Sequence, residues 1–227
     1  MGRVRREWQD GAVLHIMNRG VHRSTLFLTR FDYQKFLKLM MEMTIRYECE
    51  VLAYCLMRNH YHLLLRTAET PVWQCMQFLQ MNYAMYFNRE KTLTGYPFES
   101  RYLSYPILDE NCLLTASRYI HLNPVNSGIV QDPSAYQYSS YRGYLAFENN
   151  ILLSPELILS QFGDVHPEHK YQEFVEGSAV PTALDEKILR EMAKMEPLVG
   201  SRLLSDCLSG VLSGDQENAG KQHTYCI

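Results

Sequence analysis

The sequence lacks several patterns that would each define a class of protein. No apolar run is long enough to span a bilayer, so we expect no transmembrane helix. The N-terminal residues MGRVRREWQDGAVLH are basic, but no apolar stretch follows them, so we expect no signal peptide. The six cysteines are scattered without a CxxC pair, which excludes zinc-knuckle spacing and is typical of reduced thiols in a cytosolic protein.

The overall charge gives little sign of a nucleic-acid partner, because it averages two unlike halves. The net charge of the 227 residues is −3. Residues 1–130 carry 15 basic and 11 acidic side chains, a balance of +4, whereas residues 131–227 carry 7 and 14, a balance of −7. This asymmetry suggests a core domain that faces a polyanion and an acidic extension, although +4 over 130 residues is also ordinary for a globular domain.

Two histidines separated by one residue are the most informative feature that is present. His60 and His62 lie in the apolar run VLAYCLMRNHYHLLL. On a strand, residues i and i+2 point to the same face, so both imidazoles leave the sheet together while Tyr61 points the other way. Two convergent imidazoles make an incomplete metal site. The alternative is a pair of core histidines, each satisfied by its own partner.

A second segment offers groups that would complete such a site. Residues 109–123 have roughly helical apolar spacing, with Asp109 as N-cap, and Pro124 predicts that the helix ends near Asn123. Tyr119 and Asn123 are four residues apart and therefore share a helix face. The tyrosine could attack an electrophile, and the Asn carbonyl oxygen could be a third metal ligand.

The order of expected elements predicts an α+β fold. Strands are expected at residues 12–17, 50–56, 60–66 and 98–105, and helices at 31–48, 71–89 and 109–123. This is the split βαβ pattern of a ferredoxin-like antiparallel sheet with packed helices. The buried stripe of the 71–89 helix is expected to contain Trp73, Met76, Leu79, Tyr83, Tyr86 and Phe87.

The C-terminal part is expected to be a helical extension without further strands. We place the domain boundary at residue 130, with residues 131–227 as the extension. Short helices are expected at 134–147, 155–162, 168–176, 185–195 and 201–212, and the last fifteen residues are polar and expected to fray. The tyrosines of YQYSSYRGY (136–144) could stack on bases, but packing between helices is the more common use.

Several stretches together resemble the single-tyrosine HUH transposases, in particular their REP-associated branch. These are HIMNRG (15–20), YCLMRNHYHLLL (54–65), YAMYFNRE (83–90), GYPFESRY (95–102), SRYIHLNPVNSGIV (117–130) and YQYSSYRGYL (136–145). The combination of the His-x-His strand with the R-Y-I-x-L-N-P-V segment is specific. The chain departs from the family at Arg58, where relatives have proline, and at Leu103, where many relatives carry a basic residue.

The resemblance implies a role for each candidate residue. His60, His62 and Asn123 would bind a divalent metal, Mg²⁺ or Mn²⁺, and Tyr119 would be the nucleophile. The implied reaction is cleavage and rejoining of single-stranded DNA through a 5′-phosphotyrosine, on substrates with short hairpins such as repetitive extragenic palindromes. His121 is two positions from Tyr119, so a packing role is the simpler interpretation for it.

The resemblance also implies partners and a location. Beside these, the residues themselves offer candidates for phosphate contacts that flank the proposed site, of which we expect about half to touch DNA, since each alone could be a solvated surface charge: Arg19, Arg23, Arg58, Arg89, Lys91, Arg101 and Arg118. We expect a cytoplasmic, nucleoid-associated bacterial protein with no membrane partner, which could form a homodimer. The alternatives are a non-catalytic regulator that binds DNA or RNA hairpins, and a metal-dependent phosphodiesterase with water as its nucleophile.

Overall fold

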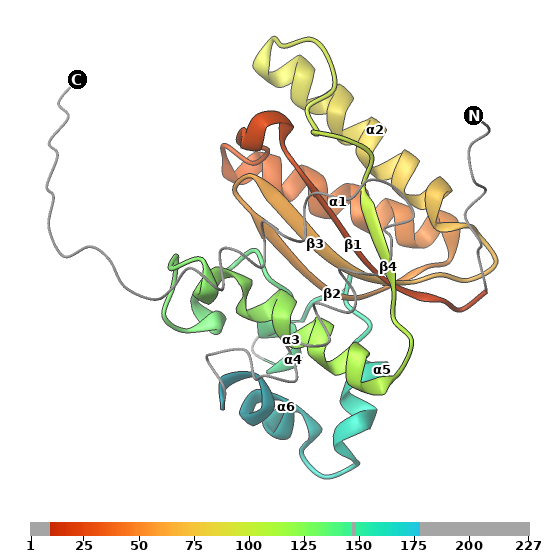
Figure 1. Ribbon diagram of the computed structural model, residues 1–227, viewed down its shortest axis with the longest axis vertical. Helices are drawn as coiled ribbons and strands as arrows, with labels where there is room; N and C mark the ends of the chain where they lie inside the picture. The colour runs from red at the N-terminus through yellow and green to blue at the C-terminus, as the bar shows by residue number, and fades with distance from the viewer. Residues whose placement is uncertain (1–9, 147–148, 178–227) are drawn as a thin grey trace, which may run out of the picture.

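The computed structural model describes residues 10–146 and 149–177 and shows a four-stranded sheet with helices on both faces (Figure 1). The strands are β1 Val13–Arg19, β2 Glu50–Met57, β3 His60–Arg66 and β4 Leu103–Pro106. The helices of at least four residues are α1 Arg30–Tyr47, α2 Val72–Lys91, α3 Glu110–Asn126, α4 Tyr141–Tyr144, α5 Glu156–Leu159 and α6 Pro167–Glu176. Within these residues, no helix has both the length and the apolar character needed to cross a membrane.

The sheet has the topology that the sequence predicts. Its strand order is β2-β3-β1-β4, and every neighbouring pair is antiparallel. The β1–α1–β2 unit therefore has β3 between its two strands, and the β3–α2–β4 unit has β1 between its two strands, which is the split βαβ arrangement. The predicted ferredoxin-like α+β fold is confirmed.

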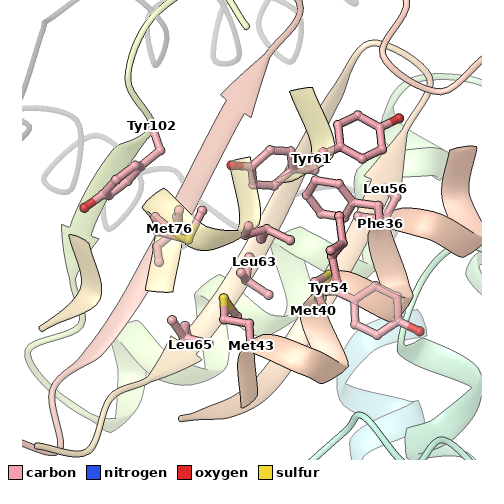
Figure 2. Packing of buried hydrophobic residues seen from close by; sticks show 14 of the residues in the cluster. Phe36, Met40, Met43, Tyr54, Leu56, Tyr61, Leu63, Leu65, Met76 and Tyr102 are labelled. Carbon is pink, nitrogen blue, oxygen red and sulfur yellow. The ribbon is translucent and has the colours of Figure 1, made fainter. Parts of the chain in front are cut away.

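Alternation along the strands divides the core into two clusters. Tyr61 is fully buried against α1 and α2, where its hydroxyl accepts a hydrogen bond from Gln80 at 2.8 Å. Figure 2 shows Tyr61 and Leu63 among side chains of this layer. Leu64, one position further along β3, belongs instead to the cluster that includes α3. The two histidines share the parity of Leu64, so they face the α3 side of the sheet.

The boundaries of two elements, β4 and α3, differ from the sequence-based expectations. The fourth strand begins at Leu103 rather than at 98, because Phe98 forms only an isolated bridge with Gly20, and the Ser100 carbonyl accepts a hydrogen bond from the Asn18 side chain where the ladder is interrupted. Helix α3 continues past Pro124 to Asn126. The proline removes one backbone donor, but its ring is buried, and Ile129 N–H still bonds to the Pro124 carbonyl at 2.9 Å.

The predicted buried stripe of α2 is wrong at one residue. Trp73 is 50% exposed, because Val72, its neighbour in the helix, takes the position that faces the core. Successive helical residues are separated by about 100° around the axis, and Trp73 falls outside the buried stripe that contains Val72, Cys75 and Met76. Met76, Leu79, Tyr83 and Phe87 are buried as predicted, and Tyr86 is partly buried.

The segment after α3 packs directly on the sheet. Leu56 N–H bonds to the Tyr138 carbonyl, and Ser140 N–H bonds to the Tyr54 carbonyl, so residues 136–140 cover the outer edge of β2. Tyr141 and Tyr144 are buried beneath α6, which confirms a packing role for them. The predicted helices at 185–195 and 201–212 and the last fifteen residues lie outside the described residues. The domain boundary at residue 130 stays a prediction.

Candidate active site

Strand β3 contributes the two predicted histidines to the site. His60 and His62 leave the same face of β3, with ring centroids 5.2 Å apart and ring planes at 88°. His62 is fully buried, whereas His60 is only partly buried at the start of the strand. The convergence that their spacing predicts is therefore present in the structure.

Helix α3 brings the other two predicted residues to this pair. Its N-terminus is fixed by Asp109, whose carboxylate accepts a hydrogen bond from Cys112 N–H at 2.8 Å. Asn123 places its Oδ1 3.2 Å from His60 Nε2 and its Nδ2 3.4 Å from His62 Nε2. The Tyr119 ring lies edge-on to His62, with centroids 5.4 Å apart. All four predicted residues thus meet on one side of the sheet.

Sequence reasoning missed one member of the cluster, His15. This residue lies on β1, and its Nε2 is 3.1 Å from His62 Nδ1. Its ring is also 6.1 Å from the ring of Tyr119, centroid to centroid. The sequence shows that His15 lies on an expected strand, but not which residues it meets on the neighbouring strand. In the structure His15 pairs with Leu64 across the β1–β3 ladder, and the sequence does not give that register.

The histidines of this cluster are neutral at physiological pH. Burial lowers the pKa of His15 to about 4 and lowers the pKa of His62 well below its usual value. Burial also lowers the pKa of His60, although its contact with the Asn123 side chain opposes the shift. Neutral imidazole is the form that binds a metal ion, because it keeps a lone pair on one ring nitrogen.

The donor set fits a small divalent cation. Two imidazole nitrogens and one amide oxygen are ligands that Mn²⁺ accepts, and Mg²⁺ shares the preference for oxygen. Two ligands at right angles on one such ion, each about 2.1 Å from it, lie about 3 Å apart, which is close to the 3.2 Å between His60 Nε2 and Asn123 Oδ1. Within the described part of the chain, no three His, Cys, Asp or Glu side chains form a metal-binding group, so the amide is essential to this candidate.

Three of the predicted basic residues lie in the segments next to the His60 end of β3. Arg19 lies opposite His60 in the β1–β3 ladder and forms an ion pair with Glu99. Arg58 is exposed in the two-residue turn just before His60. Arg23 follows β1, and its carbonyl accepts a hydrogen bond from the side chain of Asn59 in the same turn. All three residues thus belong to the segments at the His60 end of β3, and Arg19 is the one whose charge acts on His60.

The other predicted basic residues have more varied surroundings. Arg101 is exposed next to Ser100, whose carbonyl binds Asn18 at the same end of β1. Arg118 is 6% exposed, and its guanidinium lies 5.1 Å from the Phe174 ring centre.

Two predicted cations lie at the C-terminal end of α2. Lys91 Nζ is 3.1 Å from the buried carboxylate of Asp32, which gives this lysine a role in joining α1 to α2. Arg89 is exposed and lies 3.3 Å from Glu90. Their predicted phosphate contacts, like those of Arg101 and Arg118, stay predictions.

His121 is separate from the cluster, as its spacing from Tyr119 suggests. The ring is fully buried, with Nδ1 2.7 Å from the Tyr171 hydroxyl and Nε2 2.7 Å from Ser140 Oγ. It joins α3 to α6 and to the segment along the β2 edge, which is a packing role.

The fold and the cluster define an α+β protein with two histidines on a central strand and a Tyr/Asn pair on a covering helix. The sequence matches the family described as "Transposase IS200 like" over residues 9–123, half of the chain. The chain belongs to this IS200-like transposase family, so its role is that of an enzyme in DNA transposition.

Two solved structures are similar to this chain to different degrees. The structure of a REP-associated tyrosine transposase bound to a REP hairpin matches with a TM-score of 0.56 and 18% sequence identity, covering 68% of this chain and 92% of that one. A Deinococcus radiodurans R1 protein, provisionally described as a transposase, matches with a TM-score of 0.38 and 16% identity over 51% of this chain and 92% of its own. No curated protein matches the sequence. The first match confirms the fold that the sequence predicts.

Proposed function

We propose that this transposase cleaves and rejoins single-stranded DNA by transesterification, with Tyr119 as the nucleophile. The observation that supports the proposal is the meeting of Tyr119 and Asn123 on α3 with His60 and His62 on β3. The Tyr119 oxygen forms a bond to the phosphorus, the bond from phosphorus to the 3′-oxygen breaks, and that oxygen leaves as a 3′-hydroxyl. The phenolic proton is lost as the 5′-phosphotyrosine forms.

The chain's own residues supply positioning for this reaction. His60 Nε2, His62 Nε2 and Asn123 Oδ1 are the groups that would hold Mg²⁺ or Mn²⁺. The bound cation would polarise a non-bridging phosphate oxygen and neutralise developing charge. No carboxylate is needed, because the substrate itself brings the negative charge. The phenol is held by the packing of α3, since Tyr119 is 8% exposed.

The proposed substrate is single-stranded DNA with a hairpin near the cleavage site. The support is the structural relative, which is a REP-associated tyrosine transposase bound to a REP hairpin. A hairpin would present a regular phosphate backbone to the cations around the histidine pair, Arg19, Arg23 and Arg58, with Arg101 beside them. Arg89, Lys91 and Arg118 complete the proposed phosphate-binding set.

Adduct formation by the full-length protein tests the proposal. A hairpin-bearing oligonucleotide, labelled at its 3′ end and incubated with protein and Mn²⁺, is expected to give a covalent complex that survives a denaturing gel. Chelation with EDTA should prevent it. Hairpin binding that is indifferent to metal and gives no adduct would favour the non-catalytic regulator, and cleavage without any adduct would favour a water nucleophile.

Removing a single cation near the histidine pair should weaken DNA binding without abolishing it. Arg58→Gln is expected to lower affinity for the hairpin oligonucleotide by about threefold to tenfold and to reduce the salt dependence of log K by about 0.7 to 0.9, the values for one lost contact to a single strand and to a duplex stem. Arg46→Gln changes an exposed arginine in the last turn of α1, beside the opposite end of β2, and should leave both quantities unchanged. Fluorescence anisotropy at several salt concentrations measures both. Equal effects of the two substitutions would contradict the proposed binding surface.

A further inference from the structure

Two residues outside the proposed ligand set touch the ring nitrogens that face away from Asn123. Asn59 Oδ1 is 2.7 Å from His60 Nδ1, and His15 Nε2 is 3.1 Å from His62 Nδ1. Both contacts are made to Nδ1 atoms, whereas Asn123 lies beside the Nε2 atoms, so Asn59 and His15 act from outside the proposed ligand set. Each contact instead restricts which nitrogen of its histidine carries the hydrogen.

For His60, the side-chain amide of Asn59 determines which ring nitrogen carries the hydrogen. The Asn59 side-chain nitrogen points to the Arg23 carbonyl at 3.4 Å, so its oxygen is the atom that faces His60. An amide oxygen only accepts hydrogen bonds, so His60 Nδ1 must be the donor. In the neutral ring, Nε2 then holds a lone pair, and this lone pair faces Asn123 Oδ1 at 3.2 Å.

Two acceptor atoms therefore face each other between β3 and α3. In a neutral, metal-free ring their contact is unfavourable, because neither atom has a hydrogen to share. A divalent cation bound by both atoms removes the conflict. The Asn59 contact thus acts in favour of metal binding at His60 Nε2 and against a simple His60–Asn123 hydrogen bond.

For His62, hydrogen bonds link its ring to Asn123 on α3 and to His15 on β1. Asn123 Nδ2 donates toward His62 Nε2 at 3.4 Å, which assigns the lone pair of His62 to Nε2 and its hydrogen to Nδ1. His62 Nδ1–H then donates to His15 Nε2. His15 and His62 are 2% and 0% exposed, so protein atoms rather than water determine this arrangement.

We propose that Asn59 and His15 are positioning residues that hold the hydrogens of His60 and His62 on Nδ1, so that both Nε2 lone pairs point to Asn123. This inference rests on the metal site of the proposed function. Partners of this kind orient metal-binding imidazoles in many proteins, and their loss typically costs 10- to 100-fold in metal affinity.

The tautomers are measurable in the full-length protein without metal. With ¹⁵N-labelled histidine, long-range ¹H–¹⁵N correlation spectra distinguish ring nitrogens that carry hydrogen from those that do not. The expected result is a bare Nε2 and a protonated Nδ1 at both His60 and His62, assigned through His60→Ala and His62→Ala. A protonated Nε2 at His62 in the unsubstituted protein would overturn the inference.

Metal affinity provides the second measurement, with a conservative variant for each position. His15→Phe removes the acceptor and is expected to weaken Mn²⁺ binding by about 10- to 100-fold, whereas His15→Gln keeps an acceptor oxygen and should recover most of the loss. The matched pair for His60 is Asn59→Ala, which removes the acceptor and should weaken Mn²⁺ binding in the same way, and Asn59→Asp, which keeps an acceptor oxygen. His169→Phe, at an exposed position on α6, controls for loss of a histidine. Mn²⁺ is titrated and its free concentration followed by electron paramagnetic resonance.

The outcomes separate this inference from the proposed function. If the tautomers are as stated but the unsubstituted protein binds no Mn²⁺ and forms no adduct, the proposed function fails while the assignment of hydrogens stands. If adducts form but His15→Phe and Asn59→Ala bind Mn²⁺ as the unsubstituted protein does, the positioning roles are refuted. A variant that fails to fold leaves the decision to the spectra of the unsubstituted protein.

Discussion

Tyr119→Phe is expected to abolish covalent complex formation, lowering its rate by at least about 10³-fold, as is typical when a nucleophile is removed. The phenyl ring can keep its edge-on contact with His62, so the site should retain its shape. Mn²⁺ affinity is expected to be unchanged, because the phenol is not among the proposed ligands. Denaturing gels with the labelled hairpin oligonucleotide measure the first effect, and metal titration measures the second.

The matched control is another buried tyrosine on the opposite face of the sheet. Tyr83 donates to the Leu26 carbonyl at 2.7 Å, so Tyr83→Phe should cost about 1 to 3 kcal/mol of stability. It should nevertheless form the adduct at the normal rate. An adduct that persists in Tyr119→Phe would refute the assignment of the nucleophile.

A mixture of two inactive variants asks which subunit supplies the tyrosine, should the protein form dimers. In this structure Tyr119 lies beside the histidines of its own chain, and we expect it to act there. Tyr119→Phe mixed with His62→Ala should then remain inactive. Recovery of adduct in the mixture would show that the tyrosine of one copy serves the site of another.

Lowering the pH from 7.5 to 5.0 is expected to destabilise the protein strongly, although most carboxylates titrate only at lower pH. The folded state keeps His15 and His121 neutral, since burial lowers their pKa values to about 4 and about 3, against 6.5 when unfolded. Between the folded and unfolded pKa values the unfolded chain binds more protons, so stability is lost as pH falls below 6.5. From pH 7.5 to pH 5.0 each of the two should cost about 2 kcal/mol, and His62, whose pKa burial also lowers, adds a loss of the same sign.

A substitution distant from the proposed metal ligands isolates one contribution to this loss. His121→Gln removes the titrating ring but keeps groups that can bond to Tyr171 and Ser140. Urea unfolding at the two pH values should show a loss about 2 kcal/mol smaller than in the unsubstituted protein. His169→Gln, at an exposed position, should show the full loss. If His121→Gln and the unsubstituted protein lose the same free energy, burial of His121 is not a source of the acid sensitivity.

The sequence by itself determined the local structure and the parity of each strand. Alternation of side chains is a property of a single strand, so it sufficed to place His60 and His62 on one face and Tyr61 on the other. Helical spacing likewise put Tyr119 and Asn123 on one face of α3. The order of strands and helices was enough to predict the split βαβ sheet, because few topologies accommodate that order.

Only the tertiary structure decided which residues meet between elements. His15 reaches His62 because of the register between β1 and β3, and register depends on the whole packed sheet rather than on either strand. Arg118 is buried because α6 packs against α3, and a pattern within α3 carries no trace of that contact. Trp73 is exposed and its neighbour Val72 is buried, because the way α2 packs on the core decides which edge of its apolar face is covered. Local periodicity depends on backbone geometry that each segment carries within itself, whereas contacts between segments depend on shapes and registers that exist only after folding.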